Sequence, residues 1–336
     1  MTAPPALPER PRAVCVMDPA VVDLVLPAEV FARLASLTDA VLVEPWSGAG
    51  YPKELAEAEI LLTGWGCPPL DAGVLARAPR LRAVLHAAGT VKALVGDAVW
   101  ERGITVSSAA DANAGPVVSF TLALIALAAR RTLSSAAGHG TVWPTVTDRP
   151  GADGLPVGII GASRIGRGVI EGLRRADADY RVLVSDPHVT DEEARRLGAE
   201  RVGLAELCRR SAVVSVHAPL LPETTGLLDA GLLASIPDGG ALINTARGAL
   251  VDTEALTAEC AAGRLEAYLD VTDPEPLPPG HPLYSLPHVL VTPHIAGAQG
   301  SEVRRLGAYA VEEAARWLAG EPLLGEVTRD GLRHLA

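Results

Sequence analysis

Four ionisable side chains in the second half of the chain follow apolar runs that end abruptly: Arg247, Asp270, Glu275 and His294. Such runs predict buried strands, and the carboxyl ends of parallel strands meet at one edge of a sheet, where ligands bind. Arginine binds a carboxylate through two parallel hydrogen bonds, and histidine transfers a proton near neutral pH. A neighbouring carboxylate holds the imidazole and favours its charged form. Taken singly, these residues also fit a surface arginine, a turn-capping histidine and solvated loop carboxylates.

A glycine-rich turn precedes them, in the stretch GIIGASRIGRGV at 158–169. It lies between an apolar run and a helical pattern, where a helix N-terminus offers free N–H groups to an anion. Gly161 and Gly166 fit a dinucleotide turn, but Ser163 replaces the expected middle glycine, so an ordinary strand-to-helix turn is the alternative. The Ser163 hydroxyl can donate to a phosphate oxygen. Asp186 stands 20 residues after Gly166, which suits a ribose 2′-hydroxyl and repels a 2′-phosphate, so NAD is the predicted cofactor.

The elements that must position these groups are βα units, because short apolar runs alternate with helical patterns along the whole chain. The expected strands are 13–17, 40–43, 60–63, 83–86, 105–107, 156–160, 181–185, 212–216, 241–244, 267–269 and 289–292. A long apolar helix over 114–134, a connector over 138–154 and a last helix over 301–319 complete the pattern.

This pattern predicts an α/β chain with two doubly wound parallel-sheet domains. A Rossmann NAD-binding domain is expected over 109–299. A flavodoxin-like substrate domain is expected over 1–108 and 300–336, with the terminal helix packed back on the first part.

Composition narrows the possible partners. The formal net charge is −11, which argues against nucleic acid and anionic membranes. The apolar stretch at 120–129 is taken as too short to span a bilayer, and the first dozen residues lack an apolar signal core. No C-x-x-C pair occurs, so no metal site or disulfide framework is suggested, and buried free thiols in a cytoplasmic protein are expected. The four cysteines are Cys15, Cys67, Cys208 and Cys260.

Five segments in combination resemble the D-isomer-specific 2-hydroxyacid dehydrogenase family: GIIGASRIGR, VSVHAPLLPETTGLL, GALINTARGALVD, LDVTDPEPLPPGHPLY and VLVTPHIAG. The LDVTDPEPLP segment and the HPL that follows it are most similar to the glyoxylate/hydroxypyruvate reductase branch. The first hundred residues match only in pattern.

The resemblance implies a role for each matching residue. Arg247 would bind the substrate carboxylate and carbonyl, and His294 would be the general acid/base with Glu275 as its partner. The substrate-binding residues implied are Ala87, Ala88, Gly89, Thr90 and Arg247, the first four through backbone N–H groups. The cofactor-lining residues implied are Gly161, Ser163, Arg164, Ile165, Gly166, Asp186, His217, Ala218, Pro219, Thr225, Thr245, Ala246, Arg247, Asp270 and His294.

The sequence departs from the family pattern at several points. Ser119 stands in the long helix where a glutamate is usual, and the loop HAAGTVK differs from the commoner glycine-rich form that ends in an acidic residue. Because the HAAGTVK loop differs, the resemblance does not identify the substrate. Trp65 could wall a substrate pocket, although a tryptophan in a glycine-flanked loop more often packs under its own loop.

These observations predict an NAD-dependent enzyme that reduces small 2-oxo acids and oxidises 2-hydroxy acids, working as a homodimer. A dinucleotide-sensing binding protein of the same fold, similar to known co-repressors, is the alternative from another class. Phosphoglycerate oxidation, and formate or phosphite oxidation, are further alternatives within the fold. A His–Glu pair fits hydroxy-acid chemistry better than formate oxidation, which needs no alkoxide proton.

Overall fold

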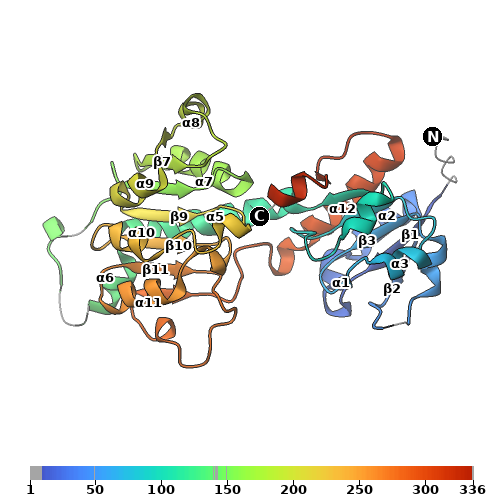
Figure 1. Cartoon of the computed structure of the whole chain (residues 1–336), viewed down its shortest axis with the longest axis horizontal. Coiled ribbons are helices and arrows are strands. Elements are labelled where there is room, and N and C mark those ends of the chain that lie inside the picture. Colours follow the sequence, from blue (N-terminus) through green and yellow to red (C-terminus); the bar gives the residue numbers. More distant parts are fainter. Residues whose placement is uncertain (1–9, 49, 139, 141–142, 149, 335–336) are drawn as a thin grey trace. The chain divides into compact units, whose positions relative to one another are not determined.

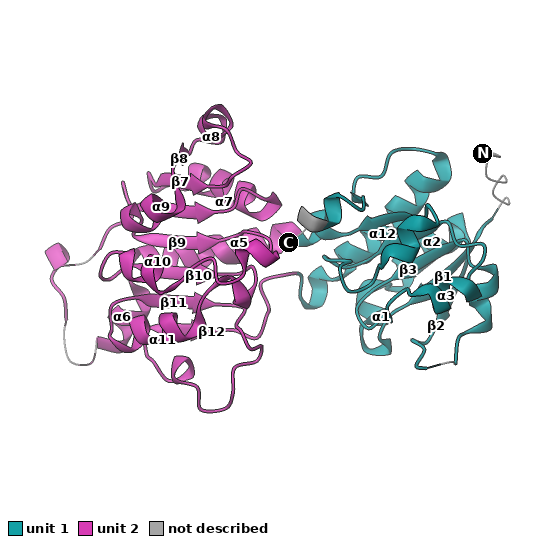
Figure 2. Cartoon of the chain, viewed as in Figure 1, with its two compact units in different colours: residues 1–113, 298–335 teal, residues 114–297, 336 magenta. Residues whose placement is uncertain are grey.

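The computed structural model describes residues 10–48, 50–138, 140, 143–148 and 150–334. The chain divides into two compact units, one formed by residues up to 113 together with 298–335 and the other by 114–297 with 336 (Figure 2). Each unit contains its own sheet, so an α/β chain with two mostly parallel sheets, as the pattern predicted, is confirmed.

Unit 1 is built on a six-stranded sheet in the order β13-β5-β4-β3-β1-β2 (Figure 1). Five of its strands are parallel: β1 (Arg12–Val16), β2 (Asp39–Val43), β3 (Ile60–Thr63), β4 (Ala83–His86) and β5 (Thr105–Ser108). The edge strand β13 (Glu326–Val327) is antiparallel to β5. The inner strands β3 and β4 are buried at every position, which explains their uninterrupted apolar runs.

Helices cover both faces of this sheet. One face packs against α1 (Pro19–Val25), α2 (Ala28–Leu37) and α12 (Arg304–Ala319). The other packs against α3 (Ala72–Arg77) and α4 (Asp97–Glu101). The carboxyl ends of the parallel strands are therefore left as the edge at which loops can form a site.

Unit 2 is built on a seven-stranded, fully parallel sheet in the order β12-β11-β10-β9-β6-β7-β8. Its strands are β6 (Pro156–Ile160), β7 (Arg181–Ser185), β8 (Glu200–Arg201), β9 (Val213–Val216), β10 (Ala241–Asn244), β11 (Glu266–Leu269) and β12 (Val289–Val291). The strand order reverses between β6 and β9, and in open α/β sheets this is the point where dinucleotides bind.

The two faces of this sheet are covered by different helices. The helices α5 (Ala110–Ala129) and α7 (Arg164–Arg175) pack on one face, together with α8 (Asp191–Leu197). The opposite face packs against α9 (Leu204–Arg210), α10 (Ala230–Ser235) and α11 (Thr253–Ala261).

The expected single helix over 114–134 is wrong. The structure has α5 ending at Ala129 and a separate helix α6 (Thr132–Gly138). Arg131, between them, has φ +49°, a left-handed conformation that an α-helix cannot continue through. The expected strands lie within one residue of those observed, but β8 and β13, each two residues long, were not predicted.

The apolar stretch at 120–129 belongs to a longer element than expected. Helix α5 has 20 residues and is long and apolar enough to cross a membrane by length and composition alone. The expectation that this apolar stretch is too short to span a bilayer is therefore wrong. Leu124, Ile125 and Ala128 pack instead against strand residues such as Val157 of the unit 2 sheet. This packing buries 33% of the apolar window, so it accounts for part of the apolar sequence.

Two buried histidines predict that mild acid destabilises the chain. His86 and His217 are buried, and burial lowers their pKa from 6.5 to about 4 and about 3. The unfolded chain therefore binds more protons below pH 6.5, so the stability present above that pH is lost as the pH falls. We expect the free energy of unfolding to fall by about 3 kcal/mol per histidine between pH 6.5 and 4.

Urea unfolding followed by circular dichroism across this pH range tests the expectation. His86→Gln should show a shallower loss of stability with acid than the wild type, and the exposed His188→Gln should behave like the wild type. If the free energy of unfolding falls equally steeply with acid in all three proteins, the loss does not come from buried neutral histidine rings.

Candidate active site

His294 and Glu275 form a hydrogen-bonded pair at the carboxyl edge of the unit 2 sheet. His294 Nδ1 lies 2.7 Å from Glu275 Oε1, and the two side chains are 52% and 43% exposed. His294 follows β12, and Glu275 lies in the loop that follows β11. Among the described residues the other ring nitrogen, Nε2, has no hydrogen-bond partner and can serve a reacting group, which is the arrangement expected of an oriented acid/base.

Asp270 holds the backbone that carries His294. Its Oδ1 accepts hydrogen bonds from the Thr292 hydroxyl at 2.6 Å and the Ile295 N–H at 2.8 Å, and its Oδ2 accepts one from the Ala296 N–H at 2.8 Å. The carboxylate is buried, and His294 itself has φ +54°, an uncommon conformation for a non-glycine residue. These contacts make Asp270 a positioning residue for the His294 loop, in addition to the cofactor-lining role expected of it.

We expect Asp270→Asn to loosen this loop, because an amide NH₂ replaces one of the oxygens that accept these bonds. Each bond to a buried charged group is worth about 1.5–3 kcal/mol, so a loss of about 2–3 kcal/mol in the free energy of unfolding is expected. Turnover should fall with it. Asp273→Asn, a nearby exposed carboxylate, is the control. Unchanged stability and turnover in Asp270→Asn would contradict the positioning role.

Arg247 follows β10 and reaches the same edge. The Asn244 side chain fixes its turn, because Nδ2 donates to the Arg247 carbonyl at 2.8 Å and Oδ1 accepts from the Ala246 N–H at 3.0 Å. Gly248 is required next to it, since a Cβ there would lie 2.0 Å from the backbone of Thr272. This close approach places the Arg247 turn against the loop that contains Asp270 and Glu275.

The Arg247 guanidinium is partly buried. Burial lowers the pKa of Arg247, and the negative charge of Glu275 raises it. Arginine nevertheless remains a cation at any working pH. Its Nη1 donates to the Ala246 carbonyl at 2.6 Å, so one edge of the fork is engaged within the turn. A half-buried cation at this edge is suited to an anionic ligand.

The glycine-rich turn lies at the reversal point of the sheet, between β6 and α7. Gly161 has φ +89°, and a Cβ there would lie 2.6 Å from the Ala218 nitrogen. A Cβ on Gly166 would lie 2.0 Å from the Gly161 carbonyl oxygen. Both glycines are therefore required by close backbone packing, as a dinucleotide turn demands.

Ser163 is accommodated without strain. It has φ −65° and ψ −175°, which any residue adopts, and its hydroxyl donates to the His217 carbonyl at 3.0 Å. The hydroxyl is thus engaged with protein, which differs from the phosphate contact considered above. Ser163 is also the N-cap of the 12-residue helix α7, with no side-chain cap bond, so the first N–H groups of α7 fit an anion.

Asp186 stands at the end of β7 and contacts the same turn. Its Oδ2 accepts from the Ala162 N–H at 2.7 Å and its Oδ1 from the His188 N–H at 2.8 Å. The negative charge is therefore fixed beside the turn, where the ribose of a bound dinucleotide would lie.

The other residues that were expected to line the cofactor differ in how far they are buried. The His217 ring is buried, with Nε2 2.8 Å from the Ser215 hydroxyl, and Ala218 and Ala246 are buried too. The Thr245 hydroxyl lies 2.9 Å from that of Thr121 in the interior. Of the remaining residues, Thr225 is exposed, Arg164 and Ile165 are the first two residues of α7, and Pro219 lies in the loop after β9.

The loop Ala87–Thr90 follows β4 in unit 1. The Ala87 N–H donates to the Thr63 carbonyl at 2.7 Å and so continues the sheet ladder. The donor expected to contact a substrate carboxylate is therefore engaged in the sheet in this structure, and that contact stays a prediction. Ala88, Gly89 and Thr90 remain as candidates.

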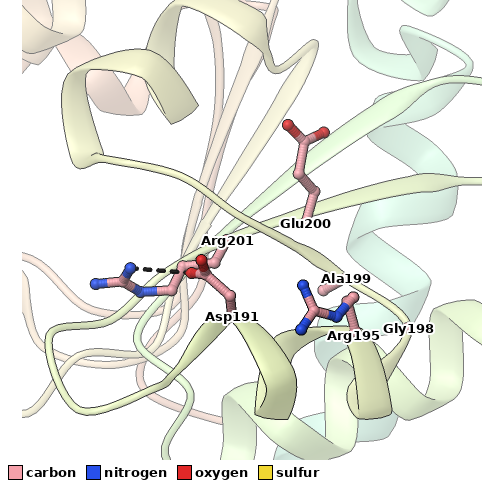
Figure 3. A pocket seen from close by; sticks show the side chains of 6 residues that line it. All are labelled: Asp191, Arg195, Gly198, Ala199, Glu200 and Arg201. Atoms are coloured by element: carbon pink, nitrogen blue, oxygen red, sulfur yellow. Dashed lines mark hydrogen bonds and ion pairs between the residues drawn. The ribbon is translucent and has the colours of Figure 1, made fainter.

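An open hollow of about 540 Å³ lies at the outer edge of unit 2, beside α8 and β8 (Figure 3). None of the expected site residues lines it, and Arg201 pairs with Asp191 at 3.1 Å within its lining. Its lining consists of Asp191, Arg195, Gly198, Ala199, Glu200 and Arg201. The side chains of Arg247, Glu275 and His294 lie elsewhere in unit 2.

The sheet order and the glycine turn of unit 2 define a dinucleotide-binding domain. The model of the NAD-binding domain of D-isomer specific 2-hydroxyacid dehydrogenases matches residues 122–296. The chain belongs to this family.

Relatives differ in their named activities. The D-3-phosphoglycerate dehydrogenase of Mycobacterium leprae is 34% identical over 317 residues, which are 92% of this chain and 59% of that protein. This chain thus spans little more than half of that relative. The glyoxylate reductase of Aeropyrum pernix is 32% identical over 264 residues, which are 75% of this chain and 78% of that protein.

Solved structures agree on the fold. The apo form of Rhodotorula graminis D-mandelate dehydrogenase has a TM-score of 0.81 at 25% identity, covering 95% of this chain and 98% of that one. A phosphoglycerate oxidoreductase from Rhizobium etli has a TM-score of 0.80 at 27% identity, covering 96% and 99%.

Proposed function

We propose that this chain is an NAD-dependent D-2-hydroxyacid dehydrogenase that interconverts a small 2-oxo acid and its 2-hydroxy acid. The His294–Glu275 pair, 2.7 Å apart and on the same sheet edge as Arg247, carries the proposal. A dinucleotide-sensing protein has no need of an acid/base pair beside its cofactor turn. The relatives' names support the reaction class and leave the substrate open.

Each residue has one task in the proposed reaction. A bound nicotinamide supplies or accepts the hydride at the substrate carbon. His294 gives a proton to the carbonyl oxygen during reduction and takes it back during oxidation, while Glu275 holds the ring. Arg247 binds the substrate carboxylate, and the amides of Ala88, Gly89 and Thr90 add hydrogen bonds to it. Fixing the carboxylate selects the face of the carbon that reacts.

A panel of 2-oxo acids assayed for NADH oxidation tests this function. Glyoxylate, hydroxypyruvate and bulkier 2-oxo acids should include at least one substrate that is turned over, and 3-phosphoglycerate with NAD tests the activity named for the mycobacterial relative. NADH binding without turnover of any acid would favour the dinucleotide-sensing alternative.

We expect a preference for NADH over NADPH, because the Asp186 carboxylate would repel a 2′-phosphate. The ratio of kcat/KM values should be about a hundredfold, since juxtaposed like charges cost several kcal/mol. Asp186→Asn keeps an oxygen for the Ala162 N–H and removes the charge. It should therefore narrow the ratio, chiefly by raising kcat/KM with NADPH. Wild-type efficiency with NADPH equal to that with NADH would contradict the expectation.

We also propose that the chain works as a homodimer. Unit 2 exposes several large apolar side chains, among them Leu127, Trp143 and Val146, at 39%, 78% and 81%. Exposed apolar side chains of this size favour a protein partner. Light scattering should give twice the chain mass, and a monomer at micromolar concentration would contradict the proposal.

A further inference from the structure

The loop that carries Glu275 is fixed at both of its ends. It follows β11, spans residues 270–277 and begins at Asp270, whose buried carboxylate accepts the bonds of the His294 loop described above. At the other end Leu277 is 3% exposed and packs in the apolar cluster that includes residues of α9, α10 and α11. The Glu275 side chain between them is 43% exposed. Core packing therefore does not place this carboxylate, and its position depends on how the backbone of the loop is held.

Side-chain hydroxyls hold the backbone of this loop. Three of its carbonyl oxygens accept such bonds, from Thr253 to Asp273 at 2.8 Å, from Thr272 to Pro274 at 2.9 Å and from Tyr284 to Leu277 at 3.3 Å. Thr272 belongs to the loop itself, and Tyr284 follows it in the chain. Thr253 comes from a separate element, because it is the first residue of α11. Its bond reaches the loop two residues before Glu275.

The start of α11 is a firm support for this bond. The Asp252 carboxylate caps the helix by accepting a hydrogen bond from a first-turn N–H at 2.9 Å, and the Asp252 N–H donates to the Leu228 carbonyl at 3.0 Å. The segment before the helix touches the loop as well, at Gly248, where a Cβ would lie 2.0 Å from the Thr272 backbone. The first half of the loop is therefore fixed by close packing and by the threonine bond together.

From these contacts we propose that Thr253 is a positioning residue for the His294–Glu275 pair. Its bond to the Asp273 carbonyl sets the place of Glu275, as Asp270 sets that of His294, so that the two side chains meet at 2.7 Å. The proposal rests on the proposed function, in which Glu275 holds the ring that transfers the proton. Thr253 acts on proton transfer through Glu275 and takes no direct part in it.

Thr253→Val tests the proposal, because it replaces the hydroxyl with a methyl group and nearly keeps the shape. We expect kcat/KM for reduction of the best 2-oxo acid to fall about two- to fivefold through kcat, as for the loss of one hydrogen bond that acts through a half-exposed pair. KM and NADH affinity should change little, because Arg247 and the glycine turn keep their contacts. Thr253→Ser keeps the hydroxyl and should keep most of the wild-type rate.

Thr257→Val is the matched control. Thr257 lies one turn further along α11, and its hydroxyl donates to the Thr253 carbonyl at 2.6 Å within the helix. This variant should keep the wild-type kcat, because the bond that it loses does not reach the Glu275 loop. An equal loss in both valine variants would point to the stability of α11 and overturn the proposal.

A double-mutant cycle separates positioning from a merely structural role. Glu275→Ala removes the group through which Thr253 acts, so Thr253→Val should cause no further loss of kcat in that background, whereas the effects of independent sites multiply. Losses that multiply would overturn the proposal, as would wild-type kcat in Thr253→Val or a loss that Thr253→Ser shares in full. A wild-type chain that binds NADH and turns over no 2-oxo acid would overturn the proposed function, and this proposal with it.

Discussion

Replacing His294 with alanine is expected to lower kcat for 2-oxo acid reduction by about 10²–10⁴-fold, the range that a positioned acid/base supplies. The variant loses the group that would protonate the oxygen, while the glycine turn and Arg247 keep their own contacts. NADH affinity, measured by fluorescence titration, should therefore change little. A variant that keeps more than about a tenth of the wild-type rate would show that His294 does not transfer the proton.

Glu275→Gln tests the pairing more finely. The glutamine keeps the shape and one hydrogen bond but removes the negative charge 2.7 Å from the ring. The ring then faces an amide that can donate as well as accept a hydrogen bond, so the ring is held less firmly and kcat/KM for 2-oxo acid reduction should fall. The kcat/KM for 2-hydroxy acid oxidation should fall in the same way.

The expected loss is modest. Both side chains are about half exposed, and charged pairs in such positions are worth about 0.2–1 kcal/mol, so kcat/KM should fall by no more than about fivefold. Wild-type kcat/KM in both directions would make Glu275 a solvated carboxylate near His294 that does not hold the ring.

Replacing Arg247 with lysine is expected to weaken transition-state binding by about 2–5 kcal/mol, by analogy with buried charged pairs in interfaces. Lysine keeps the charge but loses the planar fork that binds a carboxylate through two parallel bonds. The Arg247 side chain is only partly exposed, so water cannot easily replace the lost contact. The loss should appear in kcat/KM for the 2-oxo acid and spare NADH binding.

Arg209→Lys provides the control for this substitution, because Arg209 is an exposed arginine of α9 in the same unit. It should behave as wild type. If Arg247→Lys also retains wild-type kcat/KM on the best acid, the substrate carboxylate is bound by another group.

The order and bounds of most strands could be predicted because buried parallel strands are nearly uninterrupted apolar runs. Ile60–Thr63 and Ala241–Asn244 are buried at every position, and both were predicted with their observed bounds. The same reasoning failed for β8 and β13. Each is two residues long and lies at a sheet edge, so its pairing depends on a neighbouring strand and leaves no pattern in its own sequence.

The carboxyl-edge rule also predicts, from the sequence alone, that Arg247, Asp270, Glu275 and His294 lie on one edge. It could do so because every strand in unit 2 is parallel, and the loops that follow parallel strands must leave the sheet on the same side. The presence of candidate acid/base and anion-binding groups was therefore readable from order and residue type alone.

Only the tertiary structure decided what each of these groups contacts. The carboxylate of Asp270 is directed to the backbone of the His294 loop, the Ser163 hydroxyl to the His217 carbonyl, and the Ala87 amide to the sheet ladder. Each of these bonds joins residues from different segments of the chain at a distance set by sheet register and close backbone packing. The type of a residue establishes that it can donate or accept a hydrogen bond, and the packing of its neighbours determines which partner it reaches.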